Sequence, residues 1–285
     1  MKIEYKLNKK GFLKGIIDLN QKQIDNCIDI SEIKFADIFG IVSMTLLLKK
    51  EFNNCNKMSV IMPRNLDVSN YLHISGFVDY IKKFANVKYN GLNIISKLHS
   101  VPNISDDKEY IPLQVIHNND DVELIIEKII SWLKNKNIPE DEISKIFTVL
   151  VEIFQNAIDH SNSRDGCIFA MQKYQSELMI SIADFGIGIK EALAKNKKYV
   201  GVFKNNEETM KYIFTEKNYI NSEDDKFRGN GFYCLNNLST ERKMNFFIIS
   251  RDGFYSSEYI RGKNQRESMK IYDLEGTHVN FCINL

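Results

Sequence analysis

The chain has 285 residues, a formal net charge of +1 and a hydrophobic content of 44%. This composition is ordinary for a globular protein, and the length suits one large domain or two ordinary ones. The near-zero net charge predicts no general affinity for nucleic acid or for anionic membranes. The longest apolar run, residues 39–48, is too short for a membrane span.

The five cysteines are scattered along the chain and form no C-x-x-C pair. Their number is odd, so neither a disulfide framework nor a zinc cluster is expected. The first ten residues, MKIEYKLNKK, lack the apolar core of a signal peptide. These features together favour a cytoplasmic protein.

The first third of the chain alternates short apolar segments with helical patterns, which predicts a small α/β sheet. Expected strands cover residues 3–7, 16–19, 27–33 and 58–62, and expected helices cover residues 36–52, 66–74 and 78–84.

Two stretches in this third, FADIFGI at 35–41 and LHISGF at 72–77, resemble the STAS-type domain of anti-sigma-factor antagonists. The resemblance implies an interaction module. Antagonists carry a phosphoacceptor serine just before the glycine, but here Phe39 precedes Gly40, and Ser43 lies one turn later. The resemblance therefore does not extend to that phosphorylation switch.

Residues 100–109, SVPNISDDKE, are polar and lack periodicity, so a domain boundary is expected there. We expect one domain over 1–103 and a second over 104–285. In the second domain, strands are predicted at 110–116, 166–174, 177–183, 245–250, 255–261 and 278–283, and helices at 122–134, 141–161 and 231–238. The charged segment 196–230 carries one short helical pattern and reads as a lid.

The helix predicted at 141–161 is apolar nearly all round and is interrupted by three polar residues. Glu152, Asn156 and Asp159 are spaced i, i+4 and i+7, so they share one stripe. Burial of an unpartnered carboxylate is costly, so the stripe should face a ligand, a metal or a cavity. The alternative is a solvated strip on a core helix.

A second polar stretch follows the strand at 177–183 and reads Asp184-Phe185-Gly186-Ile187-Gly188. The helix and this stretch, in this order, resemble the Asn box and first glycine box of the GHKL ATPases. The resemblance implies an antiparallel or mixed sheet with helices on one face, in an α/β fold overall, and it implies ATP and Mg²⁺ as cofactors. A P-loop motif is absent from the sequence.

By this resemblance, Asn156 is the magnesium ligand and contacts ATP, Glu152 is the catalytic general base, and Asp159 contacts the ligand through water. Asp184 is the adenine-reading position, although an aspartate at a strand end is also a common turn residue. Gly186 and Gly188 would let the backbone approach the ligand, or would simply form a tight turn.

The resemblance extends to four further positions. Gly229 and Gly231 match the second glycine box, where a helix starting at Gly231 would direct free amides at phosphate. Arg228 could add a charge-assisted contact. Thr277 matches a threonine beside the adenine aspartate, or is an ordinary strand-start residue.

The leading functional hypothesis is an ATP-dependent conformational switch with slow, Mg-dependent ATP hydrolysis, coupled to the STAS-like module. One alternative is an anti-sigma-factor-like protein serine kinase, and another is a nucleotide-sensing module without turnover. The enzyme class thus stays open between hydrolysis and transfer to a partner serine. An unidentified protein partner is expected, and a homodimer stays open.

Overall fold

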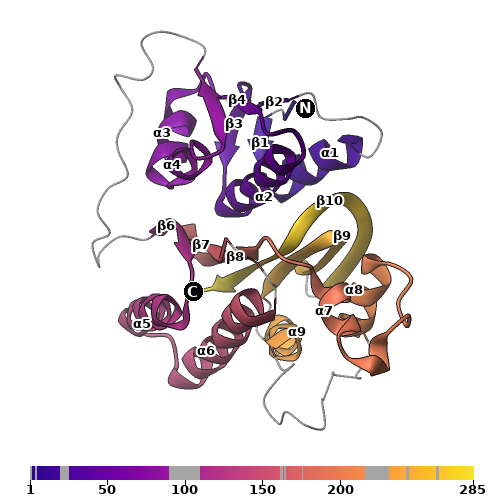
Figure 1. The fold of residues 1–285 in the computed structure, drawn as a ribbon. Helices are drawn as coiled ribbons and strands as arrows, with labels where there is room; N and C mark the ends of the chain where they lie inside the picture. The colour runs from indigo at the N-terminus through magenta and orange to yellow at the C-terminus, as the bar shows by residue number, and fades with distance from the viewer. Residues whose placement is uncertain are drawn as a thin grey trace. The chain divides into compact units, whose positions relative to one another are not determined.

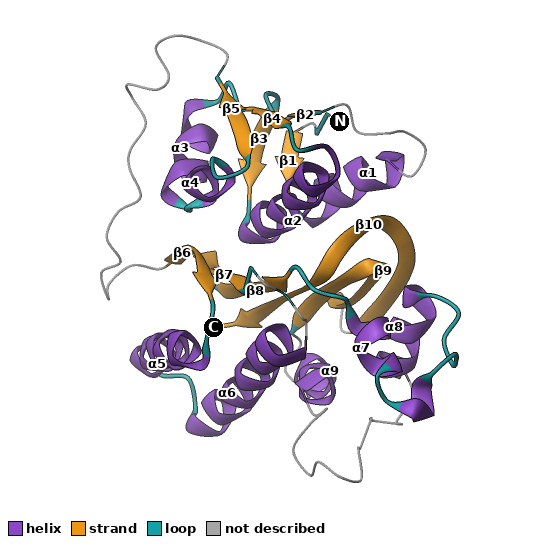
Figure 2. Cartoon of the chain, viewed as in Figure 1, coloured by secondary structure: helices purple, strands orange, loops and turns teal. Residues whose placement is uncertain are grey.

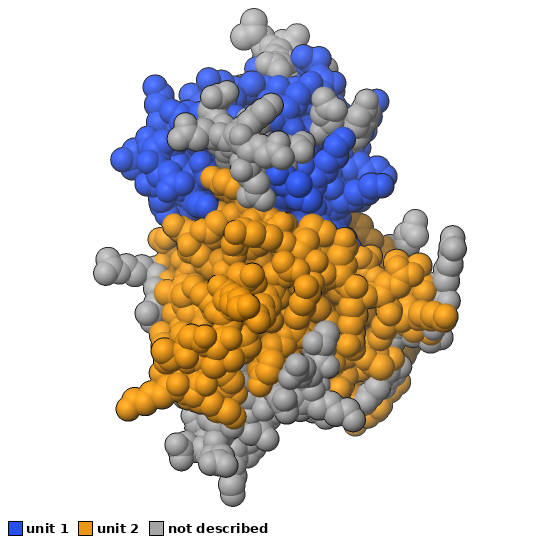
Figure 3. Space-filling view, turned by 90° about the vertical axis from the view of Figure 1, so that its right-hand side faces the viewer, with its two compact units in different colours: residues 1–114, 169–172 blue, residues 115–168, 173–285 orange. Residues whose placement is uncertain are grey.

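The computed structural model describes residues 2–3, 5–19, 26–89, 110–160, 163, 165–174, 176–215, 231–241, 244–260 and 263–285. The chain divides into two compact units, one of residues 1–114 with 169–172 and one of residues 115–168 with 173–285 (Figure 3). The boundary expected between 103 and 104 falls within 90–109, outside the described residues. No helix in the described part of the chain is long and apolar enough to cross a membrane.

The first unit is built from short parallel strands and helices (Figure 1). One sheet pairs β1 with β3, and the other has the order β2-β4-β5, with all pairs parallel. The elements are β1 (Tyr5–Leu7), α1 (Lys9–Leu19), β2 (Cys27–Asp29), β3 (Ile33–Ala36), α2 (Ile38–Cys55), β4 (Met58–Ile61), α3 (Leu66–Ile74), α4 (Phe77–Ile81) and β5 (Ala85–Lys88).

Helix α2 is the central helix of this unit and has a well-formed start. The side chain of Asp37 accepts a 2.8 Å hydrogen bond from the amide of Gly40, which is an N-cap. Burial raises the pKa of Asp37 to about 7, against the lowering effect of the amides of Gly40 and Phe39. Gly40 is required because a Cβ there would lie 2.1 Å from the carbonyl oxygen of Leu7.

Two expectations for this unit were wrong. Residues 16–19 were expected to form a strand, but they end helix α1. Phe12 and Ile16, four residues apart, are both fully buried, so the helical period determines this segment. Residues 27–33 were expected to form one strand, but Asp29 accepts a 2.8 Å hydrogen bond from the amide of Ser31, and this turn separates β2 from β3.

The chain from residue 110 onward builds a five-stranded sheet of order β6-β7-β8-β10-β9. Strand β10 is antiparallel to both β8 and β9. The elements are β6 (Tyr110–Ile116), α5 (Asn119–Asn135), α6 (Glu140–Gln155), η2 (Asn156–His160), β7 (Cys167–Tyr174), β8 (Glu177–Asp184), α7 (Ile189–Ala194), η3 (Lys197–Tyr199), α8 (Asn206–Thr215), α9 (Gly231–Glu241), β9 (Asn245–Ile260) and β10 (Lys263–Asn284).

Helices α5, α6 and α9 lie along one face of this sheet (Figure 2). The strands contribute buried apolar pairs in register, among them Ile182 with Val279 and Ile180 with Phe281. The mixed α/β architecture expected from the sequence is confirmed.

The hairpin of β9 and β10 is longer than expected. Residues 245–250 and 255–261 were expected to be two separate strands. They form one strand, and Gly253 lets α8 approach, since a Cβ there would lie 2.9 Å from Asn206. The first half of β10 was not expected at all.

Helix α8 lies inside the segment 196–230 that was expected to be a lid. Met210 and Phe214 of this helix are buried, and the ring of Phe214 stacks on that of Tyr255 with centroids 4.6 Å apart. Helix α8 therefore belongs to the core. Residues 216–230 lie outside the described residues.

Candidate functional site

Asp184 ends strand β8 as a buried carboxyl group, exposed to only 5%. Its Oδ1 accepts a 2.8 Å hydrogen bond from the amide of Gly186, and the carboxyl also accepts from the amide of Thr277. Burial raises its pKa to about 7, because removal from water disfavours the charge more than the two amides stabilise it. Both protonation states are therefore populated near neutral pH.

The second wall of this site comes from strand β10. Gly276 has a φ of +82°, and a Cβ there would lie 2.0 Å from the carbonyl oxygen of Asp184. The next residue, Thr277, donates its amide to the Asp184 carboxyl. Glycine is needed at 276 both for this backbone conformation and for the close approach of β10 to β8.

The turn after Asp184 is held by strand β9. The amide of Ile189 donates a 2.8 Å hydrogen bond to the buried hydroxyl of Ser250. The proton of Ser250 is then free for Thr277 Oγ1, 3.4 Å away. Gly188 has a φ of +84°, and a Cβ there would lie 2.6 Å from Cγ of Arg251. The lack of a side chain at Gly188 therefore allows close packing against β9.

The predicted helix 141–161 is divided in two. Helix α6 ends at Gln155, and residues Asn156–His160 form a turn of π-helix. Such turns are rare and occur frequently at functional sites. Glu152 and Asn156 are half-buried, whereas Asp159 is exposed. The π turn changes the helical period between Asn156 and Asp159, so the i, i+4, i+7 spacing does not by itself place Asp159 on the same stripe.

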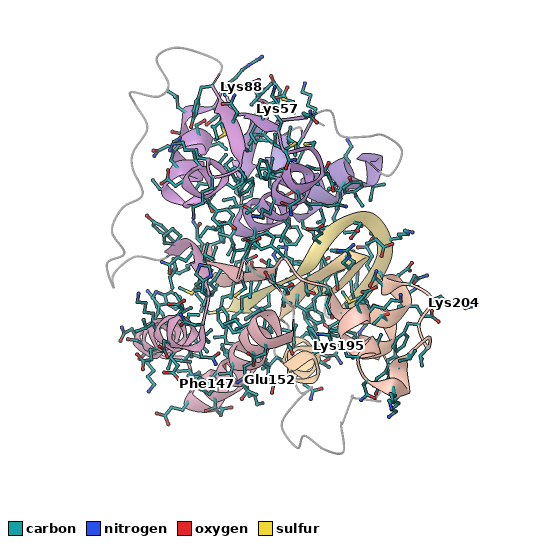
Figure 4. The ribbon with its side chains drawn as sticks, viewed as in Figure 1. Lys57, Lys88, Phe147, Glu152, Lys195 and Lys204 are labelled. Carbon is teal, nitrogen blue, oxygen red and sulfur yellow. The ribbon has the colours of Figure 1, made fainter. Side chains whose placement is uncertain are left out.

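The helical segment 140–160 and the strand that carries Asp184 are neighbours in the fold. The π turn η2 packs against β8, and α6 packs against α9, the helix that starts at Gly231. Figure 4 shows Glu152 on α6, on the side toward α9. Arg228 and Gly229, two further site residues expected from the sequence, lie outside the described residues.

The structure thus brings together Asp184, Gly186, Gly188 and Thr277 around one turn. It adds two residues that the sequence did not single out, Ser250 and Arg251. Ser250 pairs directly with Thr277 across β9 and β10. Ser250 could have been found only if the pairing of β9 with β10 had been known in advance. The sequence alone does not determine that pairing, because the hairpin contains two register shifts.

The acceptor capacity of the Asp184 carboxylate suits an adenine amine. A carboxylate has about four lone-pair positions, and two amides occupy part of that capacity. The remaining positions can accept from an exocyclic amine, which adenine has and guanine lacks at the corresponding carbon. No group of three or more His, Cys, Asp or Glu among the described residues could hold a metal ion. Asn156 with nucleotide phosphates and water would suffice for Mg²⁺.

A cavity of about 410 Å³ lies elsewhere, between the α5–α6 turn, the end of α9 and the end of β10. Its lining includes Lys136, Leu238 and Leu285, and none of the site residues expected from the sequence.

Comparisons with known proteins found no matching protein-family model and no matching curated protein. Among solved structures, the chain is similar to a chain in the SiaB–SiaC complex from Pseudomonas aeruginosa, with 11% identity and a TM-score of 0.33, covering 62% of this chain and 90% of that one. It is also similar to the catalytic domain of histidine kinase ThkA, with 15% identity and a TM-score of 0.27, covering 61% and 96%. Similarities at these TM-scores do not establish a shared fold or activity.

Proposed function

We propose that the second half of the chain is a GHKL-type nucleotide-binding domain that binds Mg-ATP and acts as an ATP-dependent conformational switch with slow hydrolysis. The observation that carries the proposal is the buried Asp184 carboxyl, held by the amides of Gly186 and Thr277 at the end of β8. In this proposal, residues 1–103 form a STAS-like interaction module and residues 104–285 form the nucleotide domain.

Each proposed role corresponds to a chemical property of the side chain. Asp184 would accept a hydrogen bond from the adenine amine, which favours its ionised form and lowers its pKa from about 7. Asn156 would bind Mg²⁺ through its side-chain oxygen. Asn156 begins the π turn, and this turn packs against β8, which carries Asp184. This packing supports a common site for the metal ion and the adenine ring.

Glu152 would take a proton from the attacking water. It lies four residues before Asn156 on α6, one helical turn away, so the two side chains project on the same side. Its half-buried position leaves it accessible to a ligand while reducing competition from bulk water. Magnesium, when bound, would neutralise charge on the phosphates. Gly229, Gly231 and Arg228 would bind the phosphates by free amides and a guanidinium group.

Isothermal titration calorimetry of the full chain with Mg-ATP and with Mg-GTP tests the proposal. We expect saturable binding of Mg-ATP and at least tenfold weaker binding of Mg-GTP, because a carboxylate cannot accept from the guanine carbonyl. Equal affinities for the two nucleotides, or no binding of either, would contradict it.

A further inference from the structure

Residues 197–204, KKYVGVFK, form a tight turn that the proposed nucleotide function leaves without a role. The amide of Val202 donates a 3.2 Å hydrogen bond to the carbonyl of Tyr199. Val200 has φ −62° and ψ 119°, and Gly201 has φ +71°. These are the torsions of a type II β-turn with glycine at its third position. The turn is therefore shaped by its own backbone and needs no partner to form.

Two aromatic residues anchor this turn to the fold. Tyr199 and Phe203 flank it, both are buried, and their rings stack with centroids 6.2 Å apart. The ring of Phe203 also lies 5.0 Å from that of Tyr212 on α8. Because α8 belongs to the core, the turn is presented on a rigid support.

The residues between these anchors point outward and are apolar. Val200 is 63% exposed and Val202 is 51% exposed, and Val200 is the most exposed large apolar side chain among the described residues. A Cβ built at Gly201 would meet nothing within 4 Å, so the tip is open on that side as well. A single exposed apolar side chain is normal, but two at the tip of one fixed turn suit insertion into an apolar phase.

Lysines surround the apolar tip. Lys197, Lys198 and Lys204 are exposed, and the eight residues contain no Asp or Glu. Lys204 extends away from the ribbon in Figure 4. Of the two acidic residues that follow the segment, Glu207 pairs with Lys211 and Glu208 accepts a hydrogen bond from the backbone amide of Lys204. The segment thus carries a local charge of +3 in a chain whose net charge is +1.

We propose that residues 197–204 dock the protein on an anionic lipid surface, with Val200 and Val202 entering the headgroup boundary and the lysines pairing with lipid phosphates and carboxylates. An apolar group combined with neighbouring cations is the combination that holds peripheral proteins on such membranes. A nucleic acid would attract the lysines but would leave the two exposed valines at the tip without an apolar contact, and an acidic partner is separated from a lipid surface by the test below. The docking needs no nucleotide, so it stands independently of the proposed function.

Vesicle sedimentation of the full chain tests the proposal. Vesicles of phosphatidylcholine alone are compared with vesicles of phosphatidylcholine and phosphatidylserine in equal parts. We expect binding only to the second kind, weakened by salt. Replacing Lys197 and Lys198 by Gln should lower the partition coefficient roughly 25-fold, at about fivefold per lysine. Replacing Val200 and Val202 by Ser should lower it about tenfold.

Matched controls remove the same groups from other surfaces. The double variant Lys57→Gln and Lys88→Gln removes two exposed lysines of the first unit, both labelled in Figure 4. Leu124→Ser removes a side chain of α5 that is 57% exposed. Both controls should bind vesicles like the wild type, and circular dichroism verifies that every variant is folded.

Three results would overturn the proposal. The first is absence of binding to phosphatidylserine vesicles, including the case in which the chain binds an acidic polymer such as heparin instead. The second is an equal loss in the control variants, which indicates a general charge effect. The third is binding that the Val200→Ser and Val202→Ser changes leave intact, which indicates adsorption without insertion.

Discussion

Gly276 on β10 lies in direct backbone contact with Asp184 at the end of β8. A Cβ at position 276 would lie 2.0 Å from the carbonyl oxygen of Asp184 and 2.8 Å from the amide nitrogen of Gly186. The contact holds the amide of Thr277 on the Asp184 carboxyl. The geometry of the candidate adenine site therefore depends on one residue that has no side chain.

Replacement of Gly276 by Ala should destabilise the protein. The left-handed backbone costs an L-residue about 1–2 kcal/mol, and forced overpacking adds about 1–3 kcal/mol. Gly201→Ala is a matched control, because its φ of +71° is similar but its Cβ would meet nothing within 4 Å. Urea denaturation should show a larger loss of unfolding free energy for Gly276→Ala than for Gly201→Ala. Equal losses of unfolding free energy would mean that the close contact between β10 and Asp184 adds nothing to the cost of the backbone conformation.

The buried Asp184 should make stability depend on pH. Its pKa is about 7 in the folded protein and 3.8 in its ordinary range, so the folded state binds the proton more tightly than the unfolded state. The resulting stabilisation is complete below about pH 4 and is lost as the pH rises through about 7, by about 1.4 kcal/mol per pH unit. Asp184→Asn lacks this contribution.

Denaturation of the wild type and of Asp184→Asn at about pH 5 and about pH 7 measures this difference. The unfolding free energy of the wild type should fall relative to that of the variant as the pH rises. The other shifted Asp and His groups, Asp37, His73 and His278, are common to both proteins and cancel in the comparison. Parallel pH profiles would contradict a raised pKa of Asp184 in the folded protein.

Glu152→Ala should separate nucleotide binding from turnover. Loss of a positioned base should lower phosphate release a hundred- to ten-thousandfold, while ATP affinity changes by no more than about threefold. Glu127→Ala, which removes an exposed carboxylate on α5, should leave both unchanged. If Glu152→Ala hydrolyses ATP like the wild type, the carboxylate is structural. If the wild type transfers phosphate only when a partner protein is added, the serine-kinase alternative replaces hydrolysis.

The first unit should not accept phosphate from the second half of its own chain. By the resemblance to anti-sigma-factor antagonists, Phe39 stands at the phosphoacceptor position, and the nearby Ser43 is fully buried, with Ser31 4% exposed. A hydroxyl in this state cannot reach a γ-phosphate without local unfolding. Incubation with labelled ATP and peptide mapping should find no label on Ser31 or Ser43. Label on either serine would contradict this and would indicate self-phosphorylation.

Local patterns predicted the long elements well and the irregular ones poorly. Helix α3 spans Leu66–Ile74 as expected, because its cap residue Asn65 and its apolar spacing agree. The π turn at Asn156 was not predictable, since a change of helical period depends on packing against β8. The break expected between strands at 245–250 and 255–261 was wrong, because Gly253 packs closely against Asn206 of α8, which is far away in the sequence.

In the candidate site too, the residues of a local motif were predictable and those brought in by long-range strand pairing were not. Asp184, Gly186 and Gly188 are adjacent in sequence, so the motif found them directly. Ser250 lies on another strand, and only the register of β9 with β10 places its hydroxyl beside Thr277 and Ile189. Long-range contacts of this kind are set by tertiary structure, and one sequence does not contain their register.

Binding of Mg-ATP to Asp184→Asn, measured by calorimetry beside the wild type, tests the adenine site most directly. Asn keeps one acceptor oxygen, and the amides of Gly186 and Thr277 compete for it. The variant should bind about ten- to a hundredfold more weakly, a loss of about 1.5–3 kcal/mol. Asp79→Asn, an exposed aspartate of the first unit, should bind like the wild type. Equal affinity of Asp184→Asn and the wild type would contradict the proposal that Asp184 binds adenine.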